Sequence, residues 1–585
     1  MENNKYTTLV NILDKIRNEA PLVFKSYHDD SSEEKINQSR SKAFIHLFLH
    51  VKFGLTNFED RHDNITDEKQ DGGLDAYYID EECRKIYLIQ SKFRTNSKTF
   101  EERSISAHDL VKMELKNILN GKRKDSNGKD FNNKIFDFQK KIKNIRNIGN
   151  YDPLVVILSN LSKYNDSQIN RLIGGYEYEV CNFERSYKEL VFPMCSGTLF
   201  DPKEIIITIN LREKLQMNLR QKINTSYGKC NIDLVFVPTL EIGRIMSIYK
   251  NAILKFNPRN YLSLSKNKVN RKIKESIIKG KDNDFSILNN GITIITENTK
   301  ATTDTGSENE GQIILTNPQI INGGQTAHTL SNIYEDENIS KDVFEGKEVL
   351  LKIVQMVRRN GNQIDFLEKI SESTNNQTKV DEADKRSNHL YQIKIQENIF
   401  KEFGYYYERK SGEFFDGKNG GYLSNELIIN RSIFLRSYLA YNGNPKDARN
   451  KSTDNLFKME SFEEIILNPD DYNKMYWSYK IYTISQTLIK QPAHKKLRLQ
   501  LKYSKYAIVA AIGWTFKKKK IDEKKFEDEI VQKISKTALK KWESFEKKIR
   551  VKRTNKIYKT ETKGFDFDNY YKGSTLNKDI EEYFS

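Results

Sequence analysis

The chain has 585 residues, with 97 Lys and Arg against 80 Asp and Glu, which gives a formal net charge of +17. Such a length predicts about three domains rather than one, and an aromatic content of 11% excludes a chain that is disordered throughout. The basic excess favours a polyanionic partner, because lysines and arginines that neutralise phosphates release condensed counterions.

The cysteines and the apolar runs indicate the compartment. Cys83, Cys181, Cys195 and Cys230 form no C-x-x-C pair, which argues against a zinc ribbon and suits a reducing environment. The start MENNKYTTLV lacks the basic and apolar regions of a secretory signal. The run YAIVAAIGW is too short to cross a bilayer of about 30 Å. We therefore expect a soluble, cytoplasmic protein without membrane contact.

The order of predicted elements indicates a multidomain α/β protein with four parts. Residues 1–168 combine helices up to about residue 57, the strands LDAYYID and KIYLIQSKF, a polar helical stretch and the buried strand PLVVILSN. Residues 169–240 form a connecting α/β segment. Residues 241–465 are mixed α/β, and residues 466–585 are mostly helical and rich in lysine.

One candidate site lies in the first part, where the segment DGGLD, from Asp71 to Asp75, precedes a strand that ends in Gln90-Ser91-Lys92. Side chains alternate along a strand, so Gln90 and Lys92 project to the same side, and a hairpin would bring Asp75 beside them. Mg²⁺ prefers oxygen ligands and keeps several waters, so Asp75 and Gln90, with Asp71 as a further candidate ligand, suffice to bind it. Lys92 would hold the attacking water or the phosphate. The alternative is an ordinary hairpin with solvated side chains.

The segments DGGLDAYYID and IYLIQSKFR resemble the PD-(D/E)XK nucleases, and among them the Mrr-like restriction branch. The resemblance implies a restriction-endonuclease-like α/β/α domain, catalytic roles for Asp75, Gln90 and Lys92, and Mg²⁺ or Mn²⁺ as the cofactor. Gln90 replaces the commoner glutamate, which removes one negative charge from the metal site. A helical glutamate completes the site in many members, and Glu33 and Glu34 both qualify.

A second group of polar turns lies between residues 241 and 465. The turn NGGQT follows the strand NPQII and precedes a helix, so its backbone N–H groups can face an anion. Asparagine and glutamine side chains in neighbouring turns add donors and acceptors without charge, which suits nucleotide or nucleic-acid binding. A tight turn chosen only for its glycines is the alternative. The candidate ligands are Asn257, Arg259, Asn290, Asn322, Gly323, Gly324, Gln325, Thr326, Asn376, Gln377 and Arg409.

These turns also carry a family resemblance. The series LKFNPRNYL, NNGITI, INGGQTAHTL, NNQTKV and YYYERKSGE resembles the abortive-infection phage-resistance (AIPR) family in its order and spacing. The resemblance implies a mixed α/β AIPR domain over residues 241–465 and a bacterial phage-defence role. Members of that family often have a nuclease-like N-terminal part, which agrees with the first candidate site.

The C-terminal part contains the best candidates for contact with a DNA backbone, namely Lys495, Lys496 and Arg498. Aromatic residues alternate with lysines in this region, as in surfaces that follow nucleic-acid strands. A solvated helix face is the alternative. These helices could also mediate homo-oligomers.

Taken together, the sequence predicts a metal-dependent endonuclease of anti-phage defence, in which the AIPR part regulates the enzyme or recognises its substrate. DNA is favoured over RNA by analogy with restriction-type nucleases, and a phage-derived trigger is an expected partner. Two alternatives remain open. One is a non-cleaving regulator that binds nucleic acid or a nucleotide, and the other is a sensor of a phage component that acts through a partner protein.

Overall fold

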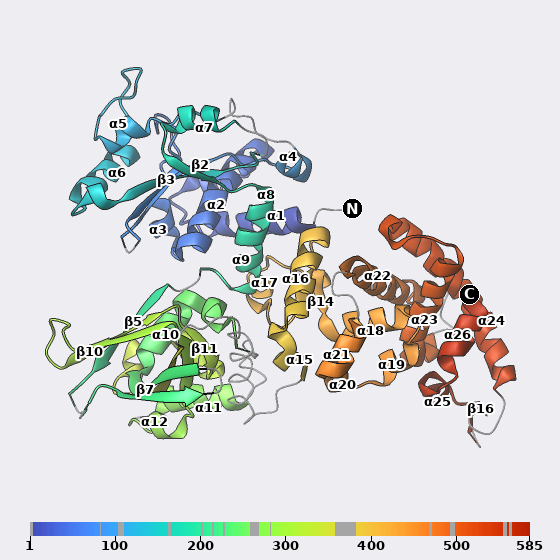
Figure 1. Cartoon of the computed structure of the whole chain (residues 1–585). Helices are drawn as coiled ribbons and strands as arrows, with labels where there is room; N and C mark the ends of the chain where they lie inside the picture. Colours follow the sequence, from blue (N-terminus) through green and yellow to red (C-terminus); the bar gives the residue numbers. More distant parts are fainter. Residues whose placement is uncertain are drawn as a thin grey trace. The chain divides into compact units, whose positions relative to one another are not determined.

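The structure is a computed structural model of the chain, shown in Figure 1 with colours that follow the sequence. It describes residues 4–81, 83–102, 110–161, 165–200, 203–212, 214, 216–225, 228–257, 268–280, 282–356, 382–466, 471–491, 498–553, 558–560 and 564–585. The chain divides into two compact units, the first formed by residues 1–367 and 412–425 and the second by residues 368–411 and 426–585.

The first unit begins with a four-stranded sheet in the order β1-β2-β3-β4. Strand β1 (Ala76–Asp80) pairs antiparallel with β2 (Lys85–Ser91), which pairs parallel with β3 (Asp152–Leu158), and β3 pairs parallel with β4 (Glu177–Val180). The strands predicted in AYYID, KIYLIQS and PLVVIL are therefore present. The helices around this sheet are α1 (Asn4–Asn18), α2 (Glu33–Phe53), α3 (Phe58–His62), α4 (Ser97–Glu101), α5 (Leu115–Leu119), α6 (Asn133–Asn144), α7 (Asp166–Ile173), α8 (Phe183–Ser186), the π-helix η4 (Tyr187–Val191) and α9 (Phe192–Ser196).

Helices cover both faces of this first sheet. On one face, alternate strand residues such as Leu88 and Val155 are buried in a core with Phe138 of α6 and Ile169 of α7. On the other face, Phe53 at the end of α2 stacks on Tyr78 of β1, with ring centroids 4.1 Å apart. The alternation of apolar residues along the strands thus produces a sheet between two layers of helices.

Helix α2 begins and ends with clear capping interactions. Ser32 accepts a hydrogen bond from the N–H of Lys35, and Gly54 ends the helix in the left-handed conformation with φ of 68°. Glu33 and Glu34 occupy the first turn, where carboxylates interact favourably with the helix dipole. The helix therefore starts with an acidic surface that is stabilised locally.

A buried arginine joins α2 to α1 and α3. Arg61 is fully buried and forms an ion pair with Glu19. Its Nε donates to Nδ1 of His46 at 3.3 Å, and its Nη1 lies 2.7 Å from Nδ1 of His50. Because a guanidinium only donates, both imidazole nitrogens must accept, so both histidines are neutral. Burial accordingly lowers the pKa of His50 to about 3 and that of His46 well below its usual value.

Residues 204–356 of the first unit form two further sheets. One has the order β5-β10-β9 and the other the order β11-β8-β12-β7-β6. The buried face of the larger sheet, with Val237 and Ile353, packs against Met246 of α10 and Leu330 of α13. The elements are β5 (Glu204–Asn210), β6 (Leu219–Thr225), β7 (Gly228–Pro238), α10 (Thr239–Tyr249), η5 (Lys250–Leu254), α11 (Lys268–Lys279), α12 (Phe285–Leu288), β8 (Ile292–Thr296), β9 (Asn298–Thr302), β10 (Glu310–Thr316), β11 (Gln319–Asn322), α13 (Gly324–Glu335), η7 (Lys341–Phe344) and β12 (Glu348–Met356); α17 (Phe415–Asn419) also belongs to this unit.

The second unit is mainly helical around one extensive apolar core. Ala510 and Ile512 of α23 and Trp542 of α24 are buried in it. Its elements are α15 (Glu382–Lys385), α16 (Leu390–Phe403), β13 (Tyr406–Glu408), β14 (Ile428–Asn430), α18 (Arg431–Tyr441), α19 (Pro445–Asn450), α20 (Thr453–Phe457), α21 (Met459–Ile465), α22 (Tyr472–Ile489), α23 (Arg498–Lys518), α24 (Asp528–Lys552), β15 (Lys559–Thr560), β16 (Gly564–Phe565), α25 (Phe567–Lys572) and α26 (Leu576–Phe584). Within the part of the chain that the structure describes, no helix combines the length and apolar content of a membrane span.

Candidate metal centre

Three aspartates meet in the loop that precedes β1. One carboxylate oxygen from each of Asp67, Asp71 and Asp75 lies within 4.8 Å of the other two. The loop closes because the N–H groups of Thr66 and Asp67 both donate to the carbonyl oxygen of Asp75, at 2.8 and 3.1 Å. These backbone bonds bring the two ends of the loop together and place Asp67 beside Asp75.

The Gly-Gly turn gives the loop its shape. Gly72 and Gly73 have φ of 66° and 76°, in the left-handed region that favours glycine. Asp71 supports the turn because its Oδ1 accepts a hydrogen bond from the N–H of Gly73 at 2.8 Å. A Cβ on Gly73 would lie 3.0 Å from the carbonyl oxygen of Lys112, and one on Gly72 would lie 2.7 Å from the ring of Phe131. The turn therefore requires glycine for both its conformation and its close packing.

Strand β2 holds Asp75 in place. The N–H of Asp75 donates to the carbonyl oxygen of Ile89 at 2.9 Å, and its Oδ2 accepts from the N–H of Ser91 at 2.6 Å. The carboxylate is thus fixed alongside the last residues of β2, as the hairpin prediction requires.

Gln90 is buried, with 5% of its surface exposed. Its Nε2 donates to the carbonyl oxygens of Gly73 and Val111, at 2.9 and 3.0 Å. One amide hydrogen therefore holds the turn and the other holds the segment that contains Val111, which leaves the amide oxygen as the atom that could bind a cation. Gln90 thus positions the Gly-Gly turn in addition to standing beside Asp75.

The electrostatic surroundings of the three carboxylates favour a positive ion. Burial, together with the neighbouring Asp67, raises the pKa of Asp75 well above its usual value, and burial raises the pKa of Asp71 to about 6. Burial also raises the pKa of Asp67, while Lys42 and Lys92 lower it. Lys92 likewise lowers the pKa of Asp75. The structure thus brings Asp71, Asp75 and Lys92 into one electrostatic neighbourhood, and a cation would relieve the repulsion among the acids.

The sequence patterns described above do not single out Asp67. The glycine pair Gly72-Gly73 is the sequence signal that could have indicated its role. A chain that reverses direction at these two residues brings position 75 back beside positions 66 and 67. Asp67, Asp71 and Asp75 are called the acidic group below. The helical glutamates Glu33 and Glu34 are not members of it. In the described part of the chain, the third carboxylate of that group comes from Asp67.

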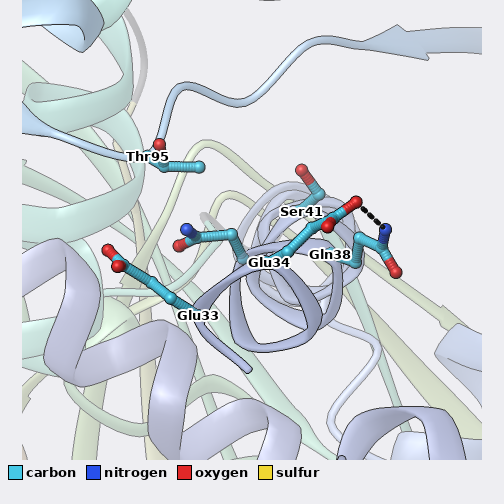
Figure 2. A pocket seen from close by; sticks show the side chains of 6 residues that line it. Glu33, Glu34, Gln38, Ser41 and Thr95 are labelled. Atoms are coloured by element: carbon cyan, nitrogen blue, oxygen red, sulfur yellow. Dashed lines mark hydrogen bonds between the residues drawn. The ribbon is translucent and has the colours of Figure 1, made fainter. Parts of the chain in front are cut away.

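Glu33 and Glu34 instead line a pocket along α2, which Figure 2 shows with Thr95 across from the helix. The pocket has a volume of about 510 Å³ and opens to solvent. It is lined by Glu33, Glu34, Asn37, Gln38, Ser41 and Thr95, whose side chains all carry polar groups, while carbon atoms form the larger part of the surface that faces the pocket.

The NGGQT turn is used extensively for packing. Gly323 begins α13 in the left-handed conformation, and a Cβ there would lie 2.9 Å from the carbonyl oxygen of Gly291. Asn257 is buried with Nδ2 3.4 Å from the carbonyl oxygen of Ile320, and a Cβ on Gly324 would lie 3.1 Å from the same nitrogen. The structure thus brings Asn257 to the turn at the start of α13.

The remaining residues of this turn are half-buried or buried. Oδ1 of Asn322 accepts from the N–H of Gly323 at 2.7 Å, and Thr326 accepts from Nδ2 of Asn289 at 3.2 Å. Gln325 is half-buried in the first turn of α13, and Asn290 is exposed just before β8. Asn289 thus contacts the turn.

The other candidates from the sequence belong to the second unit or lie outside the described residues. In the second unit, Nε of Arg409 donates to Oε1 of Gln396 at 2.7 Å, and its Nη1 donates to the carbonyl oxygen of Ser387 at 3.1 Å. Arg498 begins α23, and its side chain is outside the described part of the structure. Arg259, Asn376, Gln377, Lys495 and Lys496 also lie outside the described residues.

Comparison with known proteins gives one match. The family model described as AIPR protein matches residues 254–556, which is just over half of the chain. No curated protein and no solved structure matches the chain. The match begins after the N-terminal sheet, so it leaves the acidic group outside the matched residues.

Proposed function

This chain belongs to the AIPR protein family, which supports a role in abortive-infection phage defence, and from this premise we propose that its N-terminal region is a metal-dependent nuclease. The observation that carries the proposal is the group of three aspartates beside Gln90 and Lys92. Three oxygen ligands within 4.8 Å of one another match the spacing of ligands around a divalent ion with bonds of about 2.0–2.4 Å.

The donor set fits a hard cation. Asp67, Asp71 and Asp75 offer only oxygen, and no sulfur or nitrogen ligand belongs to the group. When bound, Mg²⁺ or Mn²⁺ would neutralise charge on the scissile phosphate and lower the pKa of a coordinated water. The carboxylates would hold the ion, and the oxygen of Gln90 would face the same place.

Lys92 supplies the positive side chain that phosphodiester cleavage needs. It is exposed directly after β2 and interacts electrostatically with Asp67 and Asp75. Its ammonium group would bind a non-bridging phosphate oxygen and orient the attacking water. Lys42 of α2, which also lowers the pKa of Asp67, would add a second positive charge for the phosphate backbone.

The substrate that we propose is DNA, on the analogy with restriction-type nucleases. The net charge of +17 supports a polyanionic substrate. The AIPR segment would regulate cleavage or recognise the substrate, in response to a phage-derived trigger and within a homo-oligomer.

The test is a cleavage assay with purified protein, plasmid DNA and Mg²⁺, with EDTA as the metal-free control. We expect Asp75→Asn and Lys92→Ala each to lower the cleavage rate by ~10²-fold or more. Lys98→Ala, an exposed lysine of the neighbouring α4, is the matched control and should cleave like the wild type. Circular dichroism verifies that all variants fold.

Two results would contradict the proposal. Equal cleavage by the wild type and both site variants would place the activity elsewhere. Metal-dependent binding of DNA without any cleavage would instead favour the non-cleaving regulator.

A further inference from the structure

Two segments line the polar pocket and also extend toward the acidic group. They are helix α2 and the residues that follow β2. On the helix, Glu34, Gln38 and Lys42 are spaced by four residues and therefore follow one face. The 3.4 Å hydrogen bond from Nε2 of Gln38 to Oε1 of Glu34, drawn in Figure 2, agrees with this placement. Lys42 in turn lowers the pKa of Asp67, so this helix face runs from the pocket to the acidic group.

The second of these segments follows β2. Thr95 lines the pocket, and Lys92, three residues earlier, acts on Asp67 and Asp75. The ring of Phe93 packs against Phe44 of α2 with centroids 5.2 Å apart, which holds the segment on the helix. Three extended residues span at most about 11 Å, and one helical turn about 5.4 Å. The N–H of Ser91 donates to Asp75, and Ser91 precedes Thr95 by four residues, so the pocket begins within about 14 Å of the acidic group.

The chemistry of the lining excludes phosphate as the occupant. The pocket contains two carboxylates and no lysine or arginine, so it would repel an anion. Ionised carboxylates only accept hydrogen bonds, whereas the side-chain amides of Asn37 and Gln38 both donate and accept. Such a lining suits an uncharged planar group with N–H donors and ring acceptors. The pocket is largely open to solvent, and its volume of about 510 Å³ leaves room for such a planar group.

We propose that this pocket binds the nucleobase next to the scissile phosphate and prefers bases with an exocyclic amino group. Carboxylates accept hydrogen bonds from cytosine N4, and amide side chains pair with N6 and N7 of adenine. Thymine has no amino group to donate. The proposal rests on the proposed nuclease function, and it adds that cleavage depends on which base lies beside the cut.

The test uses end-labelled single-stranded oligonucleotides of thymidine that contain one dA or one dC, with an all-thymidine strand for comparison. Cleavage sites are read on a sequencing gel in the presence of Mg²⁺. We expect cleavage beside dA or dC to exceed cleavage beside dT by ~5-fold or more, as one discriminating hydrogen bond of about 1 kcal/mol gives. In the double variant Glu33→Gln with Glu34→Gln, the ratio should fall below about twofold. Glu59→Gln, an exposed glutamate of α3 outside the pocket, should keep the wild-type ratio.

Binding measurements separate this proposal from the nuclease proposal. Asp75→Asn protein is titrated, in Ca²⁺, with fluorescent oligomers of deoxycytidine and of thymidine. Tighter binding of deoxycytidine that disappears in the triple variant with Glu33→Gln and Glu34→Gln supports the pocket even if the wild type cuts nothing. Cleavage by the wild type with no base preference, or equal binding of the two oligomers, overturns the pocket and leaves the nuclease standing. Preferential binding of spermidine in competition with both oligomers would identify the pocket as an amine site and also overturn the proposal.

Discussion

Asp67 occupies a position that depends on the closure of a loop rather than on a local sequence pattern. Its carboxylate is held close to those of Asp71 and Asp75, and each of the three has a raised pKa because of burial. A side chain with this placement would contribute one ligand oxygen and one negative charge to a bound ion.

We predict that Asp67→Asn weakens metal binding by ~10-fold or more, since loss of even a supporting group near a metal costs ~10–100-fold. Titration with Mn²⁺ by isothermal calorimetry measures the change. Asp60→Asn is the matched control, because Asp60 is exposed on α3 outside the acidic group. Equal Mn²⁺ affinity in Asp67→Asn and the wild type would remove Asp67 from the ligand set.

Gly73 gives a second prediction at the scale of one residue. Gly73→Ala introduces a Cβ at φ of 76°, 3.0 Å from the carbonyl oxygen of Lys112 and 3.3 Å from Nε2 of Gln90. Gly121→Ala is the matched control, because Gly121 has φ of 70° and no atom within 4 Å of the added Cβ. Both variants should lose ~1–2 kcal/mol from the left-handed conformation. Urea unfolding should show a further loss in Gly73→Ala alone, and equal losses would disprove the crowding of the turn.

At the scale of elements, the strands were predictable and the acidic group was only partly so. The apolar alternation in KIYLIQS and the apolar run PLVVIL indicate strands by local pattern alone. Asp67 could not be predicted because its polar loop, EDRHDNITDEKQDGG, contains several acidic residues that no local pattern distinguishes from one another. The backbone bonds from residues 66 and 67 to Asp75 select one of them, and such bonds depend on tertiary structure.

The second group of polar turns shows the same limit. Asn257 looks like a ligand in the sequence, yet its side chain packs on Gly324 and lies 3.4 Å from the carbonyl oxygen of Ile320. A sequence pattern indicates that a residue has a specific role, but it does not separate binding of a ligand from support of a turn. Only the contacts between distant segments make that distinction.

The contacts between α2 and Arg61 predict a pH-dependent stability. His50 is neutral in the fold with a pKa of about 3, whereas an unfolded histidine has a pKa of about 6.5. Below about pH 6.5 the unfolded state therefore binds more protons than the folded state, and the free energy of unfolding falls as the pH falls. Above that pH this contribution is constant.

The measurement compares wild type with His50→Gln, whose amide oxygen can still accept from Arg61. The stability advantage of the wild type in urea should shrink by ~1 kcal/mol for each pH unit below about 6.5. Other groups titrate equally in both proteins, so the difference isolates His50. A difference that stays constant from pH 7.5 to 5.5 would contradict the neutral histidine.

At the scale of the whole molecule, the two units have separate apolar cores and only the first contains the acidic group. We predict that calorimetric unfolding shows more than one transition, because units with their own cores unfold separately. Mn²⁺ should raise the midpoint of one transition by a few degrees and leave the other unchanged. Asp75→Asn should abolish the shift. A single transition, or a shift of every transition, would contradict this division.

All the residues of the acidic group, with Gln90 and Lys92, come from one stretch of chain between residues 67 and 92. The four strands that support them end at Val180. A ribosome that adds about 5–20 residues per second needs roughly 20–80 s to make the rest of the chain beyond residue 200. If the N-terminal sheet folds before the rest of the first unit is made, a nascent polypeptide would carry the assembled acidic group before most of the segment that the family model matches exists. Any restraint that the later segment exerts on the proposed nuclease would then begin only once that segment has been made.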